Sequence, residues 1–445
     1  MTRLCSFATC FLLLALVACS PYRKIGNAAN KIVLNDSALL TAHVGISIWD
    51  ADAGKYVFNH QGDKYFVPAS NTKIPTCYAA MKYLGDSLIA GWIARADDGA
   101  IELYPNADPT FLNPEFKYQP LFAALKGSRV VRWDLTGWRE QRWGSGWSWN
   151  DFEASYMAER SPLPIYANLM SISIKGDTLY TFPKPSAIWE SASANLYNSI
   201  TGTVSTKKFE LSRSLDKNDV IITPSAASFS RVTFPIRADV PFVSRLLQDT
   251  LRADNVSAFS VAQEYNRQVK KTAIHSQPTD SLLKPLMHRS DNFYAEQSLL
   301  MVSNQVLGYM SDGRIIDTII KTDFADLPQR PRWADGSGLS RYNLFTPQGF
   351  VGILNKMRLQ FGMNRIKEVF PTGNEGTLSN YYKNSNGSIF AKTGTLSGVV
   401  ALSGFLYTRK NKLLIFSVLV NNHQASSTAV RRAVEKFIEG IRNEY

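Results

Sequence analysis

The sequence predicts an α+β protein in which helices flank an antiparallel sheet and a large β-rich insertion interrupts the chain. Near the C-terminus, residues 387–393, 398–407 and 412–420 have strand-like patterns joined by short turns, and a helical pattern follows over 427–442. Between residues 96 and 235, short alternating runs are separated by Gly, Pro, Asn and Asp, which is typical of β structure. Helical patterns resume after this block. We therefore expect one sheet-and-helix domain whose two parts are separated in sequence by a β-rich region.

The main domain is expected to comprise residues 20–95 and 236–445, and residues 96–235 form the insertion. A chain of 445 residues with 45% apolar and 19% charged residues is long enough for two or three domains and has an ordinary globular composition. The other expected elements of the main domain are strands at 44–49 and 56–59 and helices at 78–84, 241–252, 279–287, 291–307 and 347–361.

Residues 1–19 are expected to be a lipoprotein signal peptide. Arg3 precedes an apolar run from Phe7 to Ala18, which is too short to span a membrane and is typical of a secretory signal. Cys19 follows Leu-Val-Ala and resembles the cysteine of a bacterial lipobox, which implies that it is acylated. Ser20 after it favours the outer membrane of a Gram-negative cell, with the protein facing the periplasm. The alternative is a plain signal peptide with a chance cysteine.

The net charge limits the classes of binding partner that we expect, and the cysteine content limits the disulfides. The formal net charge of +12 suits association with anionic envelope polymers or lipid surfaces. Nucleic acid is not expected for an exported protein, and no basic helix with interleaved aromatic residues occurs. Cys5 and Cys10 leave with the signal and Cys19 would carry lipid, so only Cys77 remains. We expect it to be a buried thiol, without an internal disulfide.

Ser70 and Lys73 are the candidate nucleophile and base. They lie three residues apart where a strand-rich lead gives way to a helix, so both face the same side of that helix. A serine hydroxyl becomes nucleophilic when a base takes its proton, and a lysine with a lowered pKa can serve. The spacing alone is weak, because it also occurs at Ser205–Lys208, Ser214–Lys217 and Ser281–Lys284.

Two later motifs strengthen this candidate. Ser290-Asp291-Asn292 lies between two helical patterns and could, by itself, be an ordinary helix N-cap. Lys392-Thr393-Gly394-Thr395 lies at a strand end and could be a solvated turn. Together with Ser70-x-x-Lys73, in this order, they form a signature of penicillin-binding proteins and class A β-lactamases.

The chain resembles the D-alanyl-D-alanine carboxypeptidase/endopeptidase family of class C, low-molecular-mass penicillin-binding proteins (peptidase family S13). The matching stretches are 44–48, 68–73, 108–110, 146–151, 289–296, 335–341 and 391–396. The resemblance implies the serine penicillin-binding protein/β-lactamase-like transpeptidase fold. Ser70 and Ser290 are 220 residues apart, which agrees with that family's large insertion and disfavours a class A β-lactamase. Ala107 and Asn71-Thr72 depart from the commoner family residues.

The resemblance implies an acyl-enzyme mechanism on peptidoglycan stem peptides or cross-links, with β-lactam antibiotics as covalent inhibitors. Ser70 attacks the carbonyl after Lys73 takes its proton, and the charge of Lys392 helps to keep Lys73 deprotonated. Ser290 relays a proton to the leaving amine, and Asn292 holds both the substrate and Lys73. No cofactor is implied. No metal-ligand spacing appears among the histidines.

The substrate-binding residues also follow from the resemblance. Lys392, Thr393 and Gly394 lie where the leaving residue's carboxylate would bind, and the backbone of Thr395 would align the peptide and, with that of Ser70, hold the oxyanion. In related enzymes an acid and an aromatic residue at the places of Asp151 and Tyr156 contact the side chain before the D-alanine. The alternative is that Asp151 caps a turn and Tyr156 packs, and Arg341 could contact substrate or form a structural ion pair.

Three rival functions can be compared with this one. A β-lactamase-like hydrolase would share the chemistry, and a non-catalytic envelope scaffold would share the fold but not require all three motifs. A Ser-His-Asp hydrolase is disfavoured because no Gly-x-Ser-x-Gly motif is present. The sequence leaves open the preference for carboxypeptidase or endopeptidase activity, the third stem-peptide residue and the oligomeric state.

Overall fold

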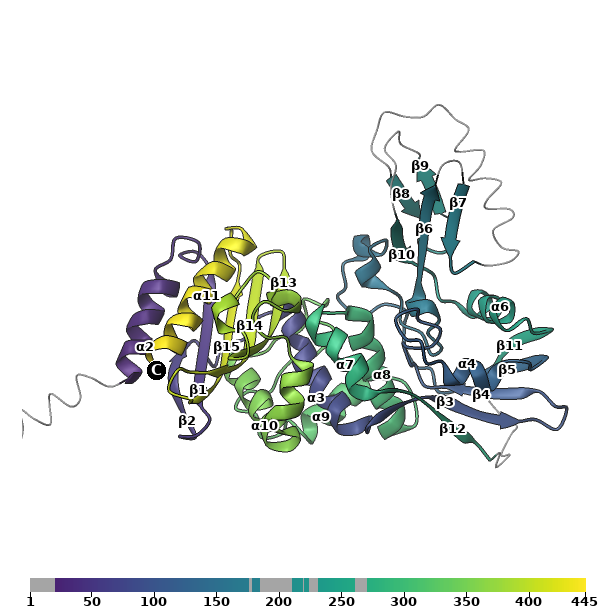
Figure 1. Cartoon of the computed structure of the whole chain (residues 1–445), viewed down its shortest axis with the longest axis horizontal. Coiled ribbons are helices and arrows are strands. Elements are labelled where there is room, and N and C mark those ends of the chain that lie inside the picture. Colours follow the sequence, from purple (N-terminus) through teal and green to yellow (C-terminus); the bar gives the residue numbers. More distant parts are fainter. Residues whose placement is uncertain (1–20, 176–177, 185–209, 219, 224–230, 261–269) are drawn as a thin grey trace, which may run out of the picture.

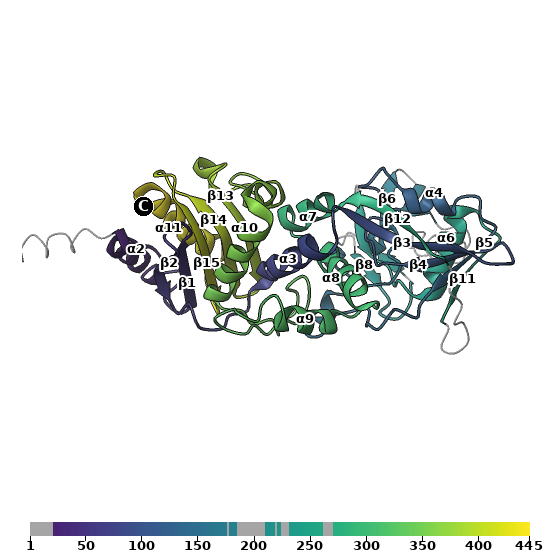
Figure 2. The same cartoon turned by 90° about the horizontal axis from the view of Figure 1, so that it is seen from below.

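The computed structural model describes residues 21–175, 178–184, 210–218, 220–223, 231–260 and 270–445. A sheet covered by helices occupies one end of the molecule and a β-rich region occupies the other (Figure 1). Between them lie four helices: α3 (Lys73–Tyr83), α7 (Thr279–His288), α8 (Asn292–Leu307) and α9 (Asp312–Lys321). Figure 2 shows the same order from below. The predicted α+β class is confirmed.

The main sheet is antiparallel and joins the two ends of the chain. Its strand order is β13-β14-β15-β1-β2. These strands are Ile389–Leu396, Val399–Tyr407, Leu413–Asn421, His43–Asp50 and Lys55–His60. β15 pairs with β1 along its whole length, so the predicted C-terminal strands and the predicted N-terminal strand form one sheet.

Helices bury both faces of this sheet. On one face, α2 (Pro21–Ala29) and α11 (Ser427–Glu444) pack on alternate strand residues such as Phe416 and Val418. On the other face, α10 (Pro347–Val369) and the central helices pack on Ile415 and Leu419. Successive side chains of a strand point to opposite faces, so a nearly continuous apolar strand such as β15 requires both layers.

The inserted region contains a second sheet of mixed direction. Its strand order is β11-β5-β4-β3-β12, and β5 runs parallel to both of its neighbours. The strands are Asn255–Phe259, Val130–Asp134, Ile101–Pro105, Ser87–Arg95 and Thr272–Pro278. The helices α4 (Pro120–Leu125) and α6 (Val240–Leu251) cover it, and the buried Trp133 lies in this core.

Two smaller sheets rise from this region. One has the order β10-β6-β7, formed by Val232–Pro235, Leu169–Lys175 and Thr178–Phe182, and the other pairs β8 (Glu210–Arg213) with β9 (Val220–Thr223). In the described part of residues 96–235, the β-rich texture corresponds to strands β4 to β10. The second sheet also uses β3, β11 and β12, which lie outside that range.

Some predicted features fall outside the described residues, namely the signal peptide 1–19 with Cys19, and the Ser205–Lys208 pair. In the part of the chain that is described, no helix has the length and apolar character needed to cross a membrane. Cys77 is fully buried in α3, as expected, and burial raises the pKa of its thiol well above the usual value.

Candidate active site

Ser70 lies in a tight turn at the start of the first catalytic helix. A single 3₁₀ turn, Ala69–Thr72, precedes α3, which begins at Lys73. Two glycines allow other backbone segments to approach this turn closely. A Cβ at Gly338 would lie 2.0 Å from the carbonyl oxygen of Ala69, and one at Gly394 would lie 2.6 Å from that of Pro68. Side chains at either position would displace the Ser70 turn.

Lys73 is fully buried and directs its amine at three oxygen atoms. Its Nζ lies 3.1 Å from Ser70 Oγ, 2.6 Å from Asn292 Oδ1 and 2.6 Å from the carbonyl oxygen of Ser337. Burial lowers the pKa of Lys73 to about 8, against the opposing effect of nearby carboxylates. A neutral amine at this distance can accept the proton of the Ser70 hydroxyl.

The Ser290-Asp291-Asn292 motif both caps a helix and faces the site. Asp291 Oδ1 accepts a hydrogen bond from the Tyr294 amide at 3.0 Å, so the simple N-cap interpretation holds for Asp291. Ser290 has a φ of 64° and receives a hydrogen bond from Lys392. Asn292 binds Lys73 through Oδ1 and donates through Nδ2 to the Tyr156 carbonyl oxygen at 3.0 Å.

Lys392 is also fully buried, on the edge strand β13. Its Nζ lies 2.9 Å from Ser290 Oγ and 2.8 Å from the Thr393 carbonyl oxygen. Burial, followed by the charges of Lys73 and Arg431, lowers the pKa of Lys392 well below its usual value. Burial rather than repulsion from Lys392 is the largest cause of the lowered pKa of Lys73, which revises the expected origin of that shift.

The remaining residues of the strand motif are held by neighbouring side chains. Thr393 Oγ1 donates to Thr377 Oγ1 at 2.8 Å, and Thr395 Oγ1 accepts from Arg431. The Asn71 amide lies between the Lys392 carbonyl oxygen at 2.8 Å and Ser403 Oγ at 2.7 Å, with its nitrogen toward the former. Asn71 therefore ties the Ser70 turn to β13 and β14.

Ser70 opens onto a cavity of about 760 Å³ that Asp151, Tyr156, Arg341 and Thr395 also line. The structure thus brings the three uncertain substrate residues together with the nucleophile. The Asp151 carboxylate lies beside the Tyr156 hydroxyl, and together with burial it raises the pKa of Tyr156. Arg341 donates to the Ser397 carbonyl oxygen at 3.1 Å, a backbone contact rather than an ion pair.

A second cavity of about 450 Å³ shares Tyr156, Ser290 and Asn292 with the first. It extends from the second catalytic motif toward the smaller sheet of the inserted region, where Phe182 and Arg231 line it. The insertion therefore forms part of the wall around the reactive serine.

A family model described as the D-Ala-D-Ala carboxypeptidase 3 (S13) family matches residues 27–444. The chain belongs to this family. The resemblance inferred from the three motifs is confirmed, and with it the assignment as a serine-type D-Ala-D-Ala carboxypeptidase/endopeptidase.

Individual S13 relatives agree with this assignment. The D-alanyl-D-alanine carboxypeptidase of Actinomadura sp. (strain R39) is 26% identical over 452 residues, covering 90% of this chain and 82% of that protein. Penicillin-binding protein 4 (dacB) of Haemophilus influenzae has a TM-score of 0.71 at 19% identity, covering 94% of this chain and 98% of that one. A predatory endopeptidase of Bdellovibrio bacteriovorus has a TM-score of 0.51 at 18% identity, covering 90% and 94%. These structures confirm the expected fold.

Sequence reasoning gave no role to several residues that contact the S13 motifs. Ser337 binds Lys73, Glu296 binds Ser337, and Thr377 and Arg431 bind the strand motif. Glu296 carried a signal, because it is an acid within an otherwise apolar and neutral stretch of a predicted helix. The glycine-rich run at 335–338 carried another, since such a run permits close backbone approach.

The carboxylates near Lys73 raise the question of metal binding. Within the described ranges, no group of three or more His, Cys, Asp or Glu residues is arranged to hold a metal ion.

Proposed function

We propose that this S13 enzyme cleaves peptidoglycan stem peptides and cross-links after a D-alanine, through an acyl-enzyme at Ser70. The observation that carries the proposal is the position of Lys73, whose amine lies 3.1 Å from Ser70 Oγ and has a pKa of about 8. A base of this kind is partly neutral near pH 7, so it can activate the hydroxyl without a histidine.

In the acylation step, Ser70 Oγ attacks the D-alanine carbonyl carbon while its proton passes to Lys73 Nζ. The backbone N–H groups of Ser70 and Thr395 hold the oxyanion, and one such donor is typically worth about 3 kcal/mol of barrier. Ser290 then delivers its hydroxyl proton to the departing amine as the C–N bond breaks, and the proton that Lys73 took from Ser70 replaces it, so that Lys73 is neutral again for deacylation. Lys392, 2.9 Å from Ser290 Oγ, holds this hydroxyl. Water releases the acyl group by the reverse proton path.

The substrate is proposed to lie along β13. Lys392 and Thr393, with the small Gly394 beside them, receive the carboxylate of the leaving residue, and the backbone at Thr395 pairs with the peptide. Asp151, Tyr156 and Arg341 contact the side chain that precedes the D-alanine, which is supported by their common cavity with Ser70. β-Lactams bind as covalent inhibitors by opening on the same serine.

The decisive experiment is labelling with a fluorescent penicillin, comparing wild type with Ser70→Ala. We expect label on the wild type and none on folded S70A protein. The absence of label on wild type would contradict the proposed acyl-enzyme mechanism. Label on S70A would show that Ser70 is not the nucleophile. Rapid turnover of penicillin with no cleavage of a D-Ala-D-Ala peptide would favour the β-lactamase alternative. Neither label nor cleavage would favour the scaffold.

We also propose that the protein is a lipoprotein of the cell envelope, held at the outer membrane through acylated Cys19 and facing the periplasm. The lipobox-like Leu-Val-Ala-Cys sequence supports this. Changing Cys19 to Ala should move the protein from the membrane fraction to the soluble fraction. Continued retention of C19A in membranes would contradict lipid anchoring at this cysteine.

A further inference from the structure

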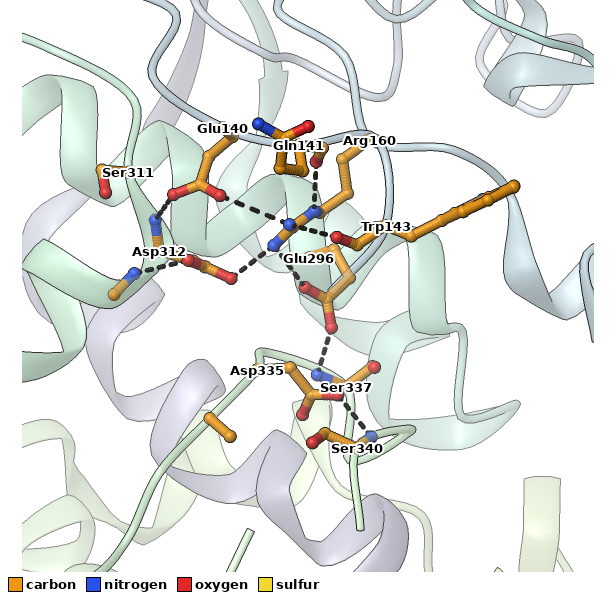
Figure 3. A network of polar contacts seen from close by, with 12 residues as sticks. Glu140, Gln141, Trp143, Arg160, Glu296, Ser311, Asp312, Asp335, Ser337 and Ser340 are labelled. Carbon is orange, nitrogen blue, oxygen red and sulfur yellow. Dashed lines mark hydrogen bonds and ion pairs between the residues drawn. The ribbon is translucent and has the colours of Figure 1, made fainter. Parts of the chain in front are cut away.

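A buried cluster of charged side chains, centred on Arg160, is connected to Lys73 through Ser337. Arg160, fully buried, contacts Asp312, lies 3.3 Å from Glu140 Oε2 and 3.7 Å from Glu296 Oε2. Figure 3 shows these three carboxylates around the guanidinium, with Asp335 below Glu296. The cluster thus has more potential negative charges than Arg160 can balance.

One residue, Ser337, connects this cluster to the catalytic base through its backbone N–H and C=O groups. The Ser337 amide donates to Glu296 Oε1 at 2.7 Å, and the Ser337 carbonyl oxygen accepts from Lys73 Nζ at 2.6 Å. The segment has little freedom to move. A Cβ at Gly336 would lie 2.7 Å from the Ala295 carbonyl oxygen, and Thr76 Oγ1 donates to the Gly336 carbonyl oxygen at 2.6 Å. The position of Glu296 therefore fixes one of the three partners of Lys73.

Glu296 and Asp335 differ in how well their oxygens are satisfied. The Asp335 carboxylate accepts four hydrogen bonds, from Gly338 N at 2.8 Å, Ser340 N at 2.6 Å, Asn343 Nδ2 at 2.7 Å and Trp147 Nε1 at 2.9 Å. These donors favour its charged form. Glu296 Oε2 is buried without a hydrogen-bond partner among the described residues. Glu296 is therefore the carboxyl group near Lys73 whose protonation can change with the least loss of hydrogen bonding.

We propose that Glu296 is a positioning residue that both holds Lys73 in line with Ser70 through the backbone of Ser337 and sets the proton affinity of Lys73 through its charge. When Glu296 is ionised, its negative charge stabilises the ammonium form of Lys73, and loss of that charge favours the neutral amine that acts as the base. This inference rests on the proposed role of Lys73 as the base.

The surrounding charges are consistent with this coupling. Asp291 at the N-cap of α8, Glu296 on α8 and Asp335 on a loop act on Lys73, while Lys392 lies on strand β13. Burial, followed by the charge of Asp335, raises the pKa of Glu296, and burial lowers the pKa of Lys73. Arg160 and the hydrogen bond from Ser337 oppose the shift of Glu296, and Asp312 adds to it. The two shifts bring the titrations of these groups closer together.

The test is the pH profile of acylation by fluorescent penicillin, measured for wild type and Glu296→Gln from about pH 5 to 10. Gln keeps an oxygen for the Ser337 amide but removes the charge. Because a nearby negative charge favours the ammonium form of Lys73, its removal should move the acidic limb to lower pH by about half a unit or more. At a fixed pH on that limb, E296Q should acylate about threefold faster than wild type.

Glu140→Gln is the matched control. It removes a carboxylate from the same arginine but has no contact with Ser337, so its acidic limb should coincide with that of wild type. Coinciding limbs for all three proteins would overturn the charge part of the proposal. An equal shift in E140Q would show that the general loss of charge around Arg160, and not Glu296, sets the base.

Glu296→Asp separates position from charge. The aspartate keeps the charge but is one methylene too short to reach the Ser337 amide. We therefore expect the acidic limb of the pH profile at nearly the wild-type pH, and a plateau acylation rate about tenfold or more lower than that of wild type. A wild-type plateau in E296D would overturn the positioning role, and this holds even if E296Q does not fold. Penicillin labelling of the wild type in the same series tests Ser70 itself, so failure of the proposed function is distinguishable.

Discussion

The two buried lysines of the active site lie among charges of opposite sign. Lys73 lies where α3, α8 and the loop after Asp335 meet, and three carboxylates act on it. Lys392 lies on the edge strand β13, and the charges that act on it, those of Lys73 and Arg431, are positive. Both side chains are fully buried. The difference in surrounding charge, rather than in burial, separates a base from an anion-binding group.

The pKa of Lys392 is expected to depend on whether substrate is bound. In the free enzyme, burial and neighbouring cations hold the pKa of Lys392 well below its usual value. A substrate carboxylate beside the amine would supply the missing negative charge and raise that pKa again. A bound carboxylate therefore favours the ammonium form of Lys392, whereas Lys73 must be neutral for reaction.

Removing the base should have the largest effect. Lys73→Ala should lower the acylation rate by a factor on the order of 10³ to 10⁴, because the Ser70 hydroxyl loses its proton acceptor. The measurement is stopped-flow labelling with fluorescent penicillin. Lys284→Ala is the matched control, since Ser281 and Lys284 have the same spacing but lie on α7 outside the site, and its rate should be unchanged. Acylation of K73A at a near-normal rate would assign the base elsewhere.

Removing the anion-binding lysine should have a smaller effect that depends on substrate. Lys392→Ala should lower cleavage of a D-Ala-D-Ala peptide by a factor on the order of 10² to 10³, because both the carboxylate contact and the hold on Ser290 are lost. With the C-terminal amide of the same peptide, the ratio of wild type to K392A should fall by about tenfold, since no carboxylate is present. Equal losses with acid and amide would mean that Lys392 acts only through Ser290.

The pH dependence should follow Lys73 rather than Lys392. Lys73 must be neutral to accept a proton, and its pKa is about 8, so kcat/KM should fall about tenfold for each pH unit well below 8 and level off above it. If Lys73→His leaves the slope and position of the acidic limb unchanged, a group other than Lys73 causes the pH dependence.

The lowered pKa of Lys73 also makes the stability of the folded protein depend on pH. A lysine whose pKa is lower in the folded than in the unfolded state makes the protein more stable as pH rises from about 8 toward 10.5.

Local sequence patterns predicted the elements and the reactive pair, but not the contacts that tune it. The α3, α8, α10 and β13–β15 patterns and the Ser70–Lys73 spacing depend on residues close together in sequence, so they could be inferred directly. The Glu296–Ser337–Lys73 connection joins three segments more than thirty residues apart, and only the fold brings them together. For the same reason, local composition does not show that β3, β11 and β12, which lie outside residues 96–235, pair into the second sheet.

The smallest predicted effect concerns residues that line the cavity but do not touch the two lysines. Asp151 is half-buried and Arg341 is exposed, so each charge should be worth about 1 kcal/mol or less against a charged stem-peptide side chain. Asp151→Asn and Arg341→Gln should therefore change KM for a charged peptide by about three- to fivefold with little change in kcat. Acylation by a penicillin that lacks this side chain should stay within about twofold of wild type and serves as the control. Equal losses with both compounds would show that these residues support the site as a whole, because a contact specific to the preceding side chain cannot slow a reaction that lacks it.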